Sequence, residues 1–386
     1  MRTNDRLLLS TGHASVDLYQ GVVPVLVPFL VAERGYGYLA VSGFVLAASL
    51  LSSVVQPLFG VLTDRWSLPW MVPAGTLAAG LGVALIGVAG TYPLTLAAIA
   101  LTGFGVAAYH PEGARLARAV TRGDHVGMSW FSLGGNVGFA LAPVIATPVL
   151  AAGGLAATPV LVVPALLGTL VTLPLLGRRT ATGATARPGR DDWPAFRLLS
   201  AVVILRSIAY VGLSSFLALF VQERVHPGDT AGGAALFLLF AGGAAGTVLG
   251  GRLAARWGRI RTIRRAYAVA VPAVAGVALV PGPALYGFVL VAAIALYVPF
   301  SLHITLGQDY LPGRVGTASG VTLGLAVSVG GVFAPALGAL ADATSLHAAL
   351  GLLPLFPAAA WLVARRLREP VRLEVGPAPS PSAFTK

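Results

Sequence analysis

The sequence contains no cysteine, and only 10% of its 386 residues are charged. Without cysteine the chain can form no disulfide, no thiolate nucleophile and no cysteine metal site. A soluble globular protein carries roughly 25% charged residues, because its surface must face water. The small charged fraction, together with 56% hydrophobic residues, therefore indicates that most of this chain faces something other than water.

Acidic residues are scarce: 14 Asp and Glu stand against 26 Lys and Arg, which leaves a net charge of +12. The basic residues fall in short gaps between apolar runs, as in the cytoplasmic loops of membrane proteins, and this pattern argues against a nucleic-acid partner. The only lysine is Lys386, so there is no G-x-x-x-x-G-K-[ST] phosphate loop, and no H-E-x-x-H zinc motif occurs. We expect no cofactor, no metal site and no ATP-driven pump.

Twelve apolar runs are long enough to cross a hydrocarbon core of about 30 Å, which takes roughly 20 helical residues. Irregular backbone cannot face lipid, and the alternation of a membrane barrel is absent, so we expect helices. The sequence predicts an all-α membrane protein with 12 transmembrane helices, at about residues 8–30, 39–62, 70–90, 93–114, 126–149, 155–176, 197–222, 231–254, 266–281, 284–307, 315–341 and 346–364.

The two halves of the chain resemble each other. A shift of 191 residues lays Arg6-Leu7-Leu8 on Arg197-Leu198-Leu199 and the Gly, Leu, Arg and Trp of 60–66 on those of 251–257. We therefore predict two pseudo-symmetric six-helix bundles, residues 1–176 and 197–368. The interval 177–196 is expected to be a cytoplasmic linker, and 369–386 a disordered cytoplasmic tail.

The distribution of basic residues predicts the orientation in the membrane. With both termini inside, cytoplasmic segments hold 23 of the 26 basic residues. Only Arg34 and Arg224 then fall outside, and Arg206 lies within a helix. The positive-inside rule therefore places both termini in the cytoplasm.

Three polar residues share one face of the first apolar run. His13, Asp17 and Gln20 are spaced by four and three residues, the spacing of one helical face. An ionised Asp at mid-helix costs roughly 2.5–3.5 kcal/mol on insertion scales, so this face must look into the protein. We predict that Asp17 takes up and releases a proton and that His13 tunes it, while a static hydrogen-bonded pair is the alternative.

The fourth apolar run ends in Tyr109-His110-Pro111-Glu112, followed by Arg115. His110 is expected inside the membrane and Glu112 nearer the cytoplasm, and Pro111 permits a bend. Glu112 and Arg115 are three residues apart and can pair. We predict that His110 and Glu112 take part in proton coupling and that Arg115 lies on the substrate pathway. The alternative is a plain interfacial ion pair between Glu112 and Arg115, which leaves His110 unexplained.

Arg206 is a basic residue within the seventh apolar run, with Tyr210 on the same face. A buried Arg faces a partner or a cavity. Three interpretations stay open: Arg206 holds an anionic substrate group, it is the permanent partner of Asp17, or its side chain snorkels towards the cytoplasm. Asn136 and His303 are weaker candidates for the substrate pathway.

The turn after the second apolar run reads Gly60-Val61-Leu62-Thr63-Asp64-Arg65, which resembles the facilitator signature G-x-L-x-D-R. The second half keeps Gly251 and Arg256, but Ala255 replaces the acid. We expect these residues to act in gating, through charge pairs between the halves.

Several motifs together resemble one branch of the major facilitator superfamily, the fosmidomycin-resistance proteins. These are His13-x-x-x-Asp17, Q-P-x-x-G-x-x-x-D at 56–64, Ser67-Leu68-Pro69-Trp70, Tyr109-His110-Pro111-Glu112 with Arg115 and Arg118, and Gly134-Gly135-Asn136-x-Gly138. The resemblance is specific over about residues 10–145. It implies the major facilitator fold, a site between the halves, and proton-driven export of phosphonate antibiotics or other small drugs.

The resulting hypothesis is a proton-coupled exporter of a small anionic or drug-like compound, a monomer in the bacterial inner membrane whose partners are its substrate, protons and lipid. The first alternative is a proton-coupled importer of an organic anion or nutrient, built from the same parts. An intramembrane enzyme or a sensor is a further alternative. The ionisable residues are, however, distributed over four helices rather than gathered into one catalytic constellation.

Overall fold

A computed structural model describes residues 3–121, 125–176, 190–225 and 228–370. The described residues are almost entirely helical and include no strand. The helices are α1 Thr3–Arg34, α2 Tyr38–Arg65, α3 Met71–Leu85, α4 Tyr92–Thr121, α5 His125–Gly153, α6 Val163–Thr172, α7 Trp193–Arg224, α8 Asp229–Trp257, α9 Arg259–Leu279, α10 Ala284–Tyr297, α11 Phe300–Tyr310, α12 Val315–Ala343, α13 Leu346–Gly351 and α14 Leu355–Ala364, with short 3-10 helices η1 Leu155–Val162, η2 Leu173–Leu175 and η3 Pro312–Arg314.

These elements form the twelve predicted membrane crossings. Eleven helical segments of the described chain are long and apolar enough to span a bilayer, and the shorter apolar helix α3 supplies the remaining crossing. The sixth, tenth and twelfth crossings are interrupted, at η1–α6, α10–α11 and α13–α14. Pro164, Pro299 and Pro354 lie at these interruptions, where a missing backbone N–H breaks the helical hydrogen-bond ladder. The predicted all-α fold is confirmed.

Several boundaries differ from the sequence prediction. Helix α2 continues to Arg65, so the gating motif predicted as a turn is helical, and α4 continues to Thr121 rather than ending near residue 114. Helix α7 begins at Trp193, inside the interval predicted as linker, because Asp192 caps it by accepting a hydrogen bond from the backbone N–H of Ala195 at 3.0 Å. Helix α9 begins at Arg259 rather than near residue 266, since its arginine-rich first turns are helical too. Most of the predicted linker (177–189) and of the predicted tail (371–386) lies outside the described residues.

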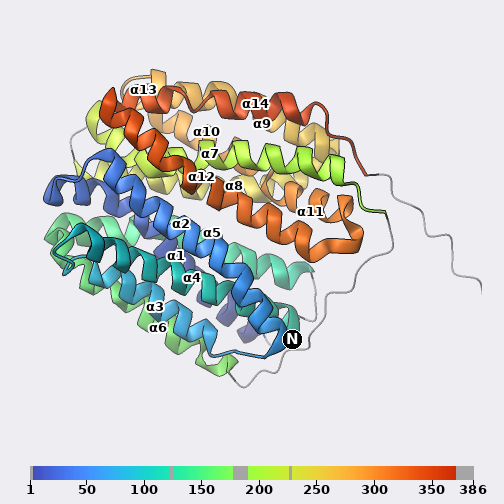
Figure 1. The fold of residues 1–386 in the computed structure, drawn as a ribbon, viewed down its shortest axis with the longest axis horizontal. Helices are drawn as coiled ribbons and strands as arrows, with labels where there is room; N and C mark the ends of the chain where they lie inside the picture. The colour runs from blue at the N-terminus through green and yellow to red at the C-terminus, as the bar shows by residue number, and fades with distance from the viewer. Residues whose placement is uncertain (1–2, 122–124, 177–189, 226–227, 371–386) are drawn as a thin grey trace, which may run out of the picture.

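The helices form two groups that lie side by side, α1–α6 in one and α7–α14 in the other (Figure 1). Helices α1 and α7 both begin at the end of the molecule marked N in Figure 1, which we name the termini end. The opposite end, where α1 turns into α2 through Gly35, we name the distal end. Gly35 has φ 64°, a backbone conformation that favours glycine.

The two groups are joined at the distal end by hydrogen bonds from α2. The carboxylate of Asp342, at the end of α12, accepts the backbone N–H of Tyr38 at 2.9 Å and of Leu39 at 2.8 Å. The Tyr38 hydroxyl donates to Glu223 of α7 at 2.7 Å. These contacts close the distal end.

The pair α2–α12 is in close contact at the middle of both helices. A Cβ on Gly331 would lie 2.4 Å from the Cβ of Ser49, so the two helices touch there. By contrast, Gly320 and Gly324, nearer the start of α12, have nothing within 4 Å of such an atom, and neither has Gly60 of α2. The contacts that hold α2 against α12 thus run from the distal end, which they close, to the middle of the two helices.

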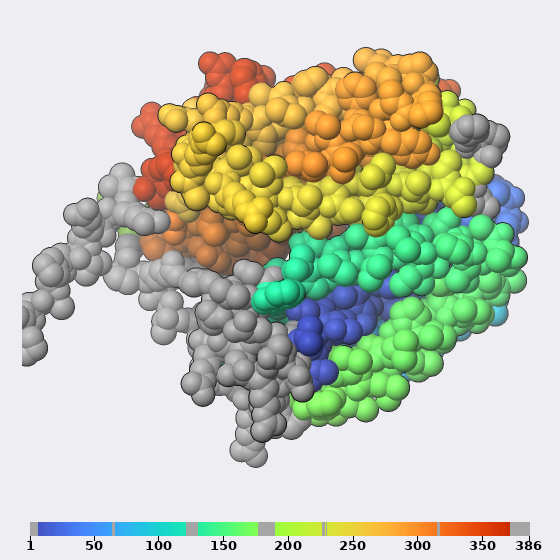
Figure 2. All heavy atoms as spheres, turned by 180° about the vertical axis from the view of Figure 1, so that it is seen from behind, coloured from blue at the N-terminus to red at the C-terminus, as the bar shows by residue number. Residues whose placement is uncertain are grey.

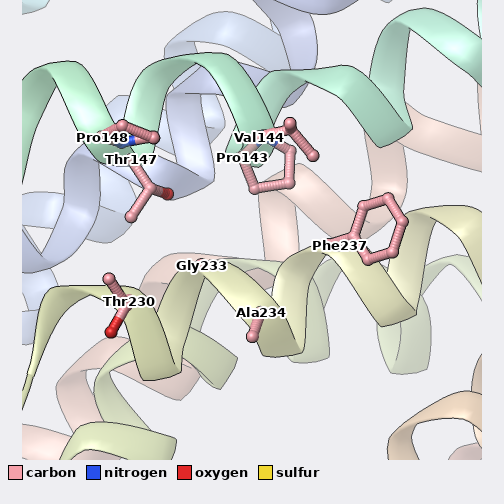
Figure 3. Close-up of a pocket in the computed structure, with 8 residues that line it drawn as sticks. All are labelled: Pro143, Val144, Thr147, Pro148, Thr230, Gly233, Ala234 and Phe237. Carbon is pink, nitrogen blue, oxygen red and sulfur yellow. The ribbon is translucent and has the colours of Figure 1, made fainter.

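Helices α5 and α8 form the second seam between the halves, visible on the outer face of the molecule (Figure 2). Near the distal end they pack closely, and a Cβ on Gly233 would lie 2.4 Å from the Thr147 hydroxyl. A shallow groove of about 240 Å³ runs along this contact, with Pro143, Val144 and Pro148 on one wall and Phe237 on the other (Figure 3). This seam, like α2–α12, is tightest at the distal end.

Candidate functional site

A buried cluster of three ionisable side chains lies between α1 and α4. Asp17 is only 5% exposed. Its Oδ2 atom lies 3.2 Å from Nε2 of His13, and its Oδ1 atom lies 3.2 Å from Nε2 of His110. The two Nε2 atoms are 3.4 Å apart. Three of the four residues predicted for proton coupling are thus in mutual contact.

Backbone carbonyls hold both imidazole rings of the cluster in place. Nδ1 of His13 donates to the carbonyl of Phe131 at 2.7 Å, and Nδ1 of His110 donates to that of Val106 at 2.8 Å. The His13 ring also lies between two aromatic rings, 4.1 Å from Phe131 and 5.9 Å from Tyr109, both nearly parallel to it. Since a carbonyl can only accept, each Nδ1 carries a hydrogen, and each Nε2 is turned towards Asp17.

Glycines of α5 make room for this cluster. A Cβ on Gly135 would lie 2.5 Å from Oδ2 of Asp17 and 3.0 Å from Nε2 of His13. A Cβ on neighbouring Gly134 would lie 2.2 Å from the backbone carbonyl of Ser10 on α1. In the sequence these glycines were noted only as part of a motif, and small residues in general allow helices to approach closely. The specific role of Gly135, which leaves space for the carboxylate, was missed, because spacing does not show which side chain faces a glycine.

The same three side chains offer ligand atoms within 4.8 Å of one another, close enough to surround one metal ion. Their separations of 3.2–3.4 Å also suit direct hydrogen bonds, in which protons join the three groups. The prediction that no metal binds here stays a prediction.

Glu112 lies apart from the cluster, although it is the other acid predicted for proton coupling. It is fully buried, and its Oε2 atom lies 3.5 Å from Nη1 of Arg115. Arg115 also donates to the carbonyl of Trp66, in the turn after α2, at 3.3 Å. Glu112 and Arg115 thus connect α4 to the turn that follows α2, whose last residues carry the gating motif.

The gating motif is only partly described. The side chains of Asp64 and Arg65 lie outside the described residues. Gly60 and its second-half counterpart Gly251 both have open space where a Cβ would lie, and Arg256 is exposed.

Arg206 is 1% exposed and lies within the second half. Its Nε donates at 2.7 Å to the carbonyl of Leu296, just before the break between α10 and α11. Its guanidinium carbon is 5.8, 4.6 and 5.1 Å from the ring centres of Tyr210, Tyr297 and Phe300. Asp17, in contrast, contacts His13 and His110, so Asp17 and Arg206 form no ion pair in this conformation. Arg206 instead joins α7 to the interrupted tenth crossing.

The remaining pathway candidates lie on separate helices. Gln20 is half-buried on α1, one turn beyond Asp17. Asn136 bonds within its own helix, donating to the carbonyl of Ser132 at 3.4 Å. His303 is buried, and its Nε2 lies 3.4 Å from the Tyr267 hydroxyl. The structure does not bring these three residues together with the cluster.

The fold and the buried ionisable cluster together define a polytopic membrane transporter. The profile of the Major Facilitator Superfamily matches residues 9–335, and the chain belongs to this family. Members of this family are transporters, not enzymes.

Two known sequences are similar to this chain over most of their length. The fosmidomycin resistance protein of Escherichia coli K12 is 28% identical, covering 88% of this chain and 86% of its own. An uncharacterized MFS-type transporter of Bacillus subtilis 168, YfnC, is 29% identical, with 94% of each chain covered. The predicted resemblance to the fosmidomycin-resistance branch is therefore confirmed.

Solved structures share the fold at low sequence identity. A bacterial homologue of the human lysosomal transporter Spinster, in an inward-facing and unoccupied conformation, superposes with a TM-score of 0.77 at 16% identity, covering 95% of this chain and 98% of that one. The fucose:proton symporter FucP of E. coli has a TM-score of 0.62 at 14% identity, with 93% and 97% covered. At such identities the likeness shows the fold alone.

Proposed function

We propose that this protein is a proton-coupled antiporter that exports a small anionic or drug-like organic compound by alternating access. The observation that carries the proposal is the His13–Asp17–His110 cluster. If both imidazoles were neutral and Asp17 ionised, two Nε2 lone pairs would face a carboxylate, with no hydrogen between them. At least one further proton must therefore reside in the cluster, and protonation of both rings would add a second.

A buried group whose proton content changes can couple a gradient to transport. Substrate affinity must differ between the two protonation states, since otherwise the gradient could not drive export. Closure of the distal end means that protons exchange with the termini end in this conformation. The side chain of His110 is 22% exposed, more than those of its two partners, so we assign it the exchange with water.

The name of the E. coli relative supports an organic drug as substrate. Arg206 is the buried cation best suited to an anionic group, because guanidinium matches carboxylate or phosphonate oxygens in two-pronged geometry. Gln20, Asn136, Tyr210, His303 and Arg115 complete the proposed pathway. The alternative of an importer uses the same parts, and one of the similar folds is a sugar:proton symporter.

The remaining proposals concern gating and placement. We propose that Asp64 and Arg65, together with Glu112 and Arg115, form the gate at the termini end. We propose the bacterial inner membrane as location and a monomer as the working unit. Both termini then lie in the cytoplasm, with the domain boundaries predicted from the sequence.

Proteoliposomes with an imposed pH gradient test the proposal, with labelled fosmidomycin as the probe. We expect Asp17→Asn to abolish uphill transport while exchange down the compound's own gradient continues, because the amide cannot release a proton. Asp309→Asn is the matched control, since Asp309 pairs with Arg259 at 2.7 Å away from the cluster, and it should keep uphill transport.

Proton movement recorded in the same vesicles decides the coupling site. Persistent stoichiometric proton flux in Asp17→Asn would remove Asp17 from this role and direct attention to Glu112. Reversing the gradient distinguishes export from import. A chelator added to the wild-type protein should change nothing; loss of transport would instead indicate a metal in the cluster.

A further inference from the structure

The second half carries an incomplete copy of the gating motif. The copy keeps its arginines but lacks the acidic residue. Residues 251–256 read G-R-L-A-A-R, in which Ala255 stands where the first half has Asp64. Arg252 and Arg256 are both exposed. Within the described part of the chain, no acidic side chain lies at ion-pair distance from either of them. Two guanidinium groups are therefore available to an anion from outside the chain.

Arg252 also lines a cavity of about 500 Å³ in the α5–α8 seam, on the termini side of the groove in Figure 3. Its other walls are apolar and come from both halves: Leu133, Ala244, Ala245, Val248 and Leu249. Ligand pockets in proteins have volumes of roughly 300–1,000 Å³. The cavity therefore has apolar walls along most of its length and the guanidinium group of Arg252 at one end.

Tryptophans place this cavity at the edge of the membrane. Trp257 follows Arg252 by five residues, or about 7.5 Å along α8. Trp130 precedes Leu133 by one turn on α5 and is exposed. Tryptophan is enriched where the hydrocarbon core meets the headgroups. Arg252 therefore lies just below the headgroup level and the apolar walls extend into the acyl region.

The seam faces outwards. Figure 2 views it from outside the molecule, with α8 above α5. Val248 and Leu249 are 50% and 37% exposed although both are apolar. In a membrane-spanning chain such side chains meet acyl chains, so the occupant enters from the bilayer rather than from water.

We propose that this seam binds an anionic phospholipid of the leaflet at the termini end. Its phosphate pairs with Arg252, and with Arg256 one turn further, while one acyl chain lies along Ala245, Val248 and Leu249. Because α5 and α8 belong to different halves, the lipid occupies the seam where they are apart and favours the conformation that is closed at the distal end. This site is independent of the substrate and of the proton cluster.

The test is thermal unfolding of the purified full chain with dioleoyl phosphatidylglycerol, dioleoyl phosphatidylcholine or soluble glycerol 3-phosphate added. We expect phosphatidylglycerol alone to raise Tm. Arg252→Gln should lose this increase, and so should Ala245→Trp, which fills the trough without changing the charge. Each variant's Tm in phosphatidylcholine shows that it is folded.

Arg261→Gln is the matched control, since it removes one exposed arginine from the same end but outside the cavity. It should keep the full increase. Retention of the increase in Arg252→Gln, or an equal loss in Arg261→Gln, would show that general surface charge is responsible and would overturn the site. An increase with glycerol 3-phosphate would point to a free anion, and competition by fosmidomycin to a substrate entrance; either result also overturns the proposal.

Discussion

At the scale of single residues, one tightly constrained position beside the cluster is a residue without a side chain. Gly135 lies against the carboxylate of Asp17, and its neighbour Gly134 lies against the backbone of α1. In most helices, glycine costs roughly 0.5–1 kcal/mol relative to alanine. Here the close approach of α5 explains why glycine stands at this position.

Gly135→Ala should therefore impair transport strongly and destabilise the protein by about 1–3 kcal/mol, the usual cost of overpacking. The added Cβ pushes the carboxylate away from the imidazoles. Gly320→Ala is the control, because nothing lies within 4 Å of its Cβ, and it should be neutral or slightly stabilising. Transport assays and thermal unfolding of both variants check this; equal behaviour of the two would contradict the packing described here.

Arg206 and Asp17 offer a second test at this scale. They contact different groups in the structure, so their substitutions should act independently. We expect the destabilisation by Asp17→Asn and by Arg206→Gln to add in the double variant within about 0.5 kcal/mol. Thermal-shift measurements on the three variants decide this. Partial recovery in the double variant would show that the two residues pair in another state of the cycle.

If Arg206 binds the anionic group of the substrate, Arg206→Lys should weaken substrate binding, because a point ammonium cannot reproduce the two-pronged geometry of guanidinium. Thermal unfolding with and without fosmidomycin measures the effect. An unchanged ligand-induced shift in Tm would leave Arg206 with only the structural role of joining α7 to α10.

At the scale of elements, the closed distal end depends on how α2 meets α12 and α7. Asp342 accepts the first backbone N–H groups of α2 from across the interface. Such a cap contributes about 1 kcal/mol. It acts only while the two halves are together at this end.

Asp342→Ala should accordingly favour opening at the distal end by about fivefold, the population change that corresponds to roughly 1 kcal/mol. A cysteine introduced at Ser49, which is buried beneath Gly331, should then react faster with a thiol reagent. Asp309→Ala, which breaks an ion pair inside the second half, is the comparison and should leave the rate unchanged. If both variants react alike, the cap does not control opening.

At the scale of the whole molecule, the orientation in the membrane is the prediction to test. The cysteine-free background allows single cysteines to be placed at Tyr36, Thr185 and Ser380. We expect an impermeant reagent to label the first from outside and the other two only from the cytoplasm, because the basic residues gather at the termini end. Labelling at Thr185 from outside would contradict the orientation.

The fold class follows from the amino-acid composition and the lengths of the apolar runs. Apolar runs of membrane length leave the backbone no partner but itself, so helices follow from composition. The pairing of His13 with Asp17 was also predictable, because both lie on one helix four residues apart and helical geometry alone brings them together.

Which distant groups meet depends on how the helices pack against one another. His110 joins the cluster and Glu112 does not, although they are two residues apart, because a helix turns by about 200° over two residues and α1 faces only one side of α4. The break before Pro299 was also needed to bring the Leu296 carbonyl to Arg206. Periodicity gives the face on which a side chain lies; the packing of other helices against that face determines its partner.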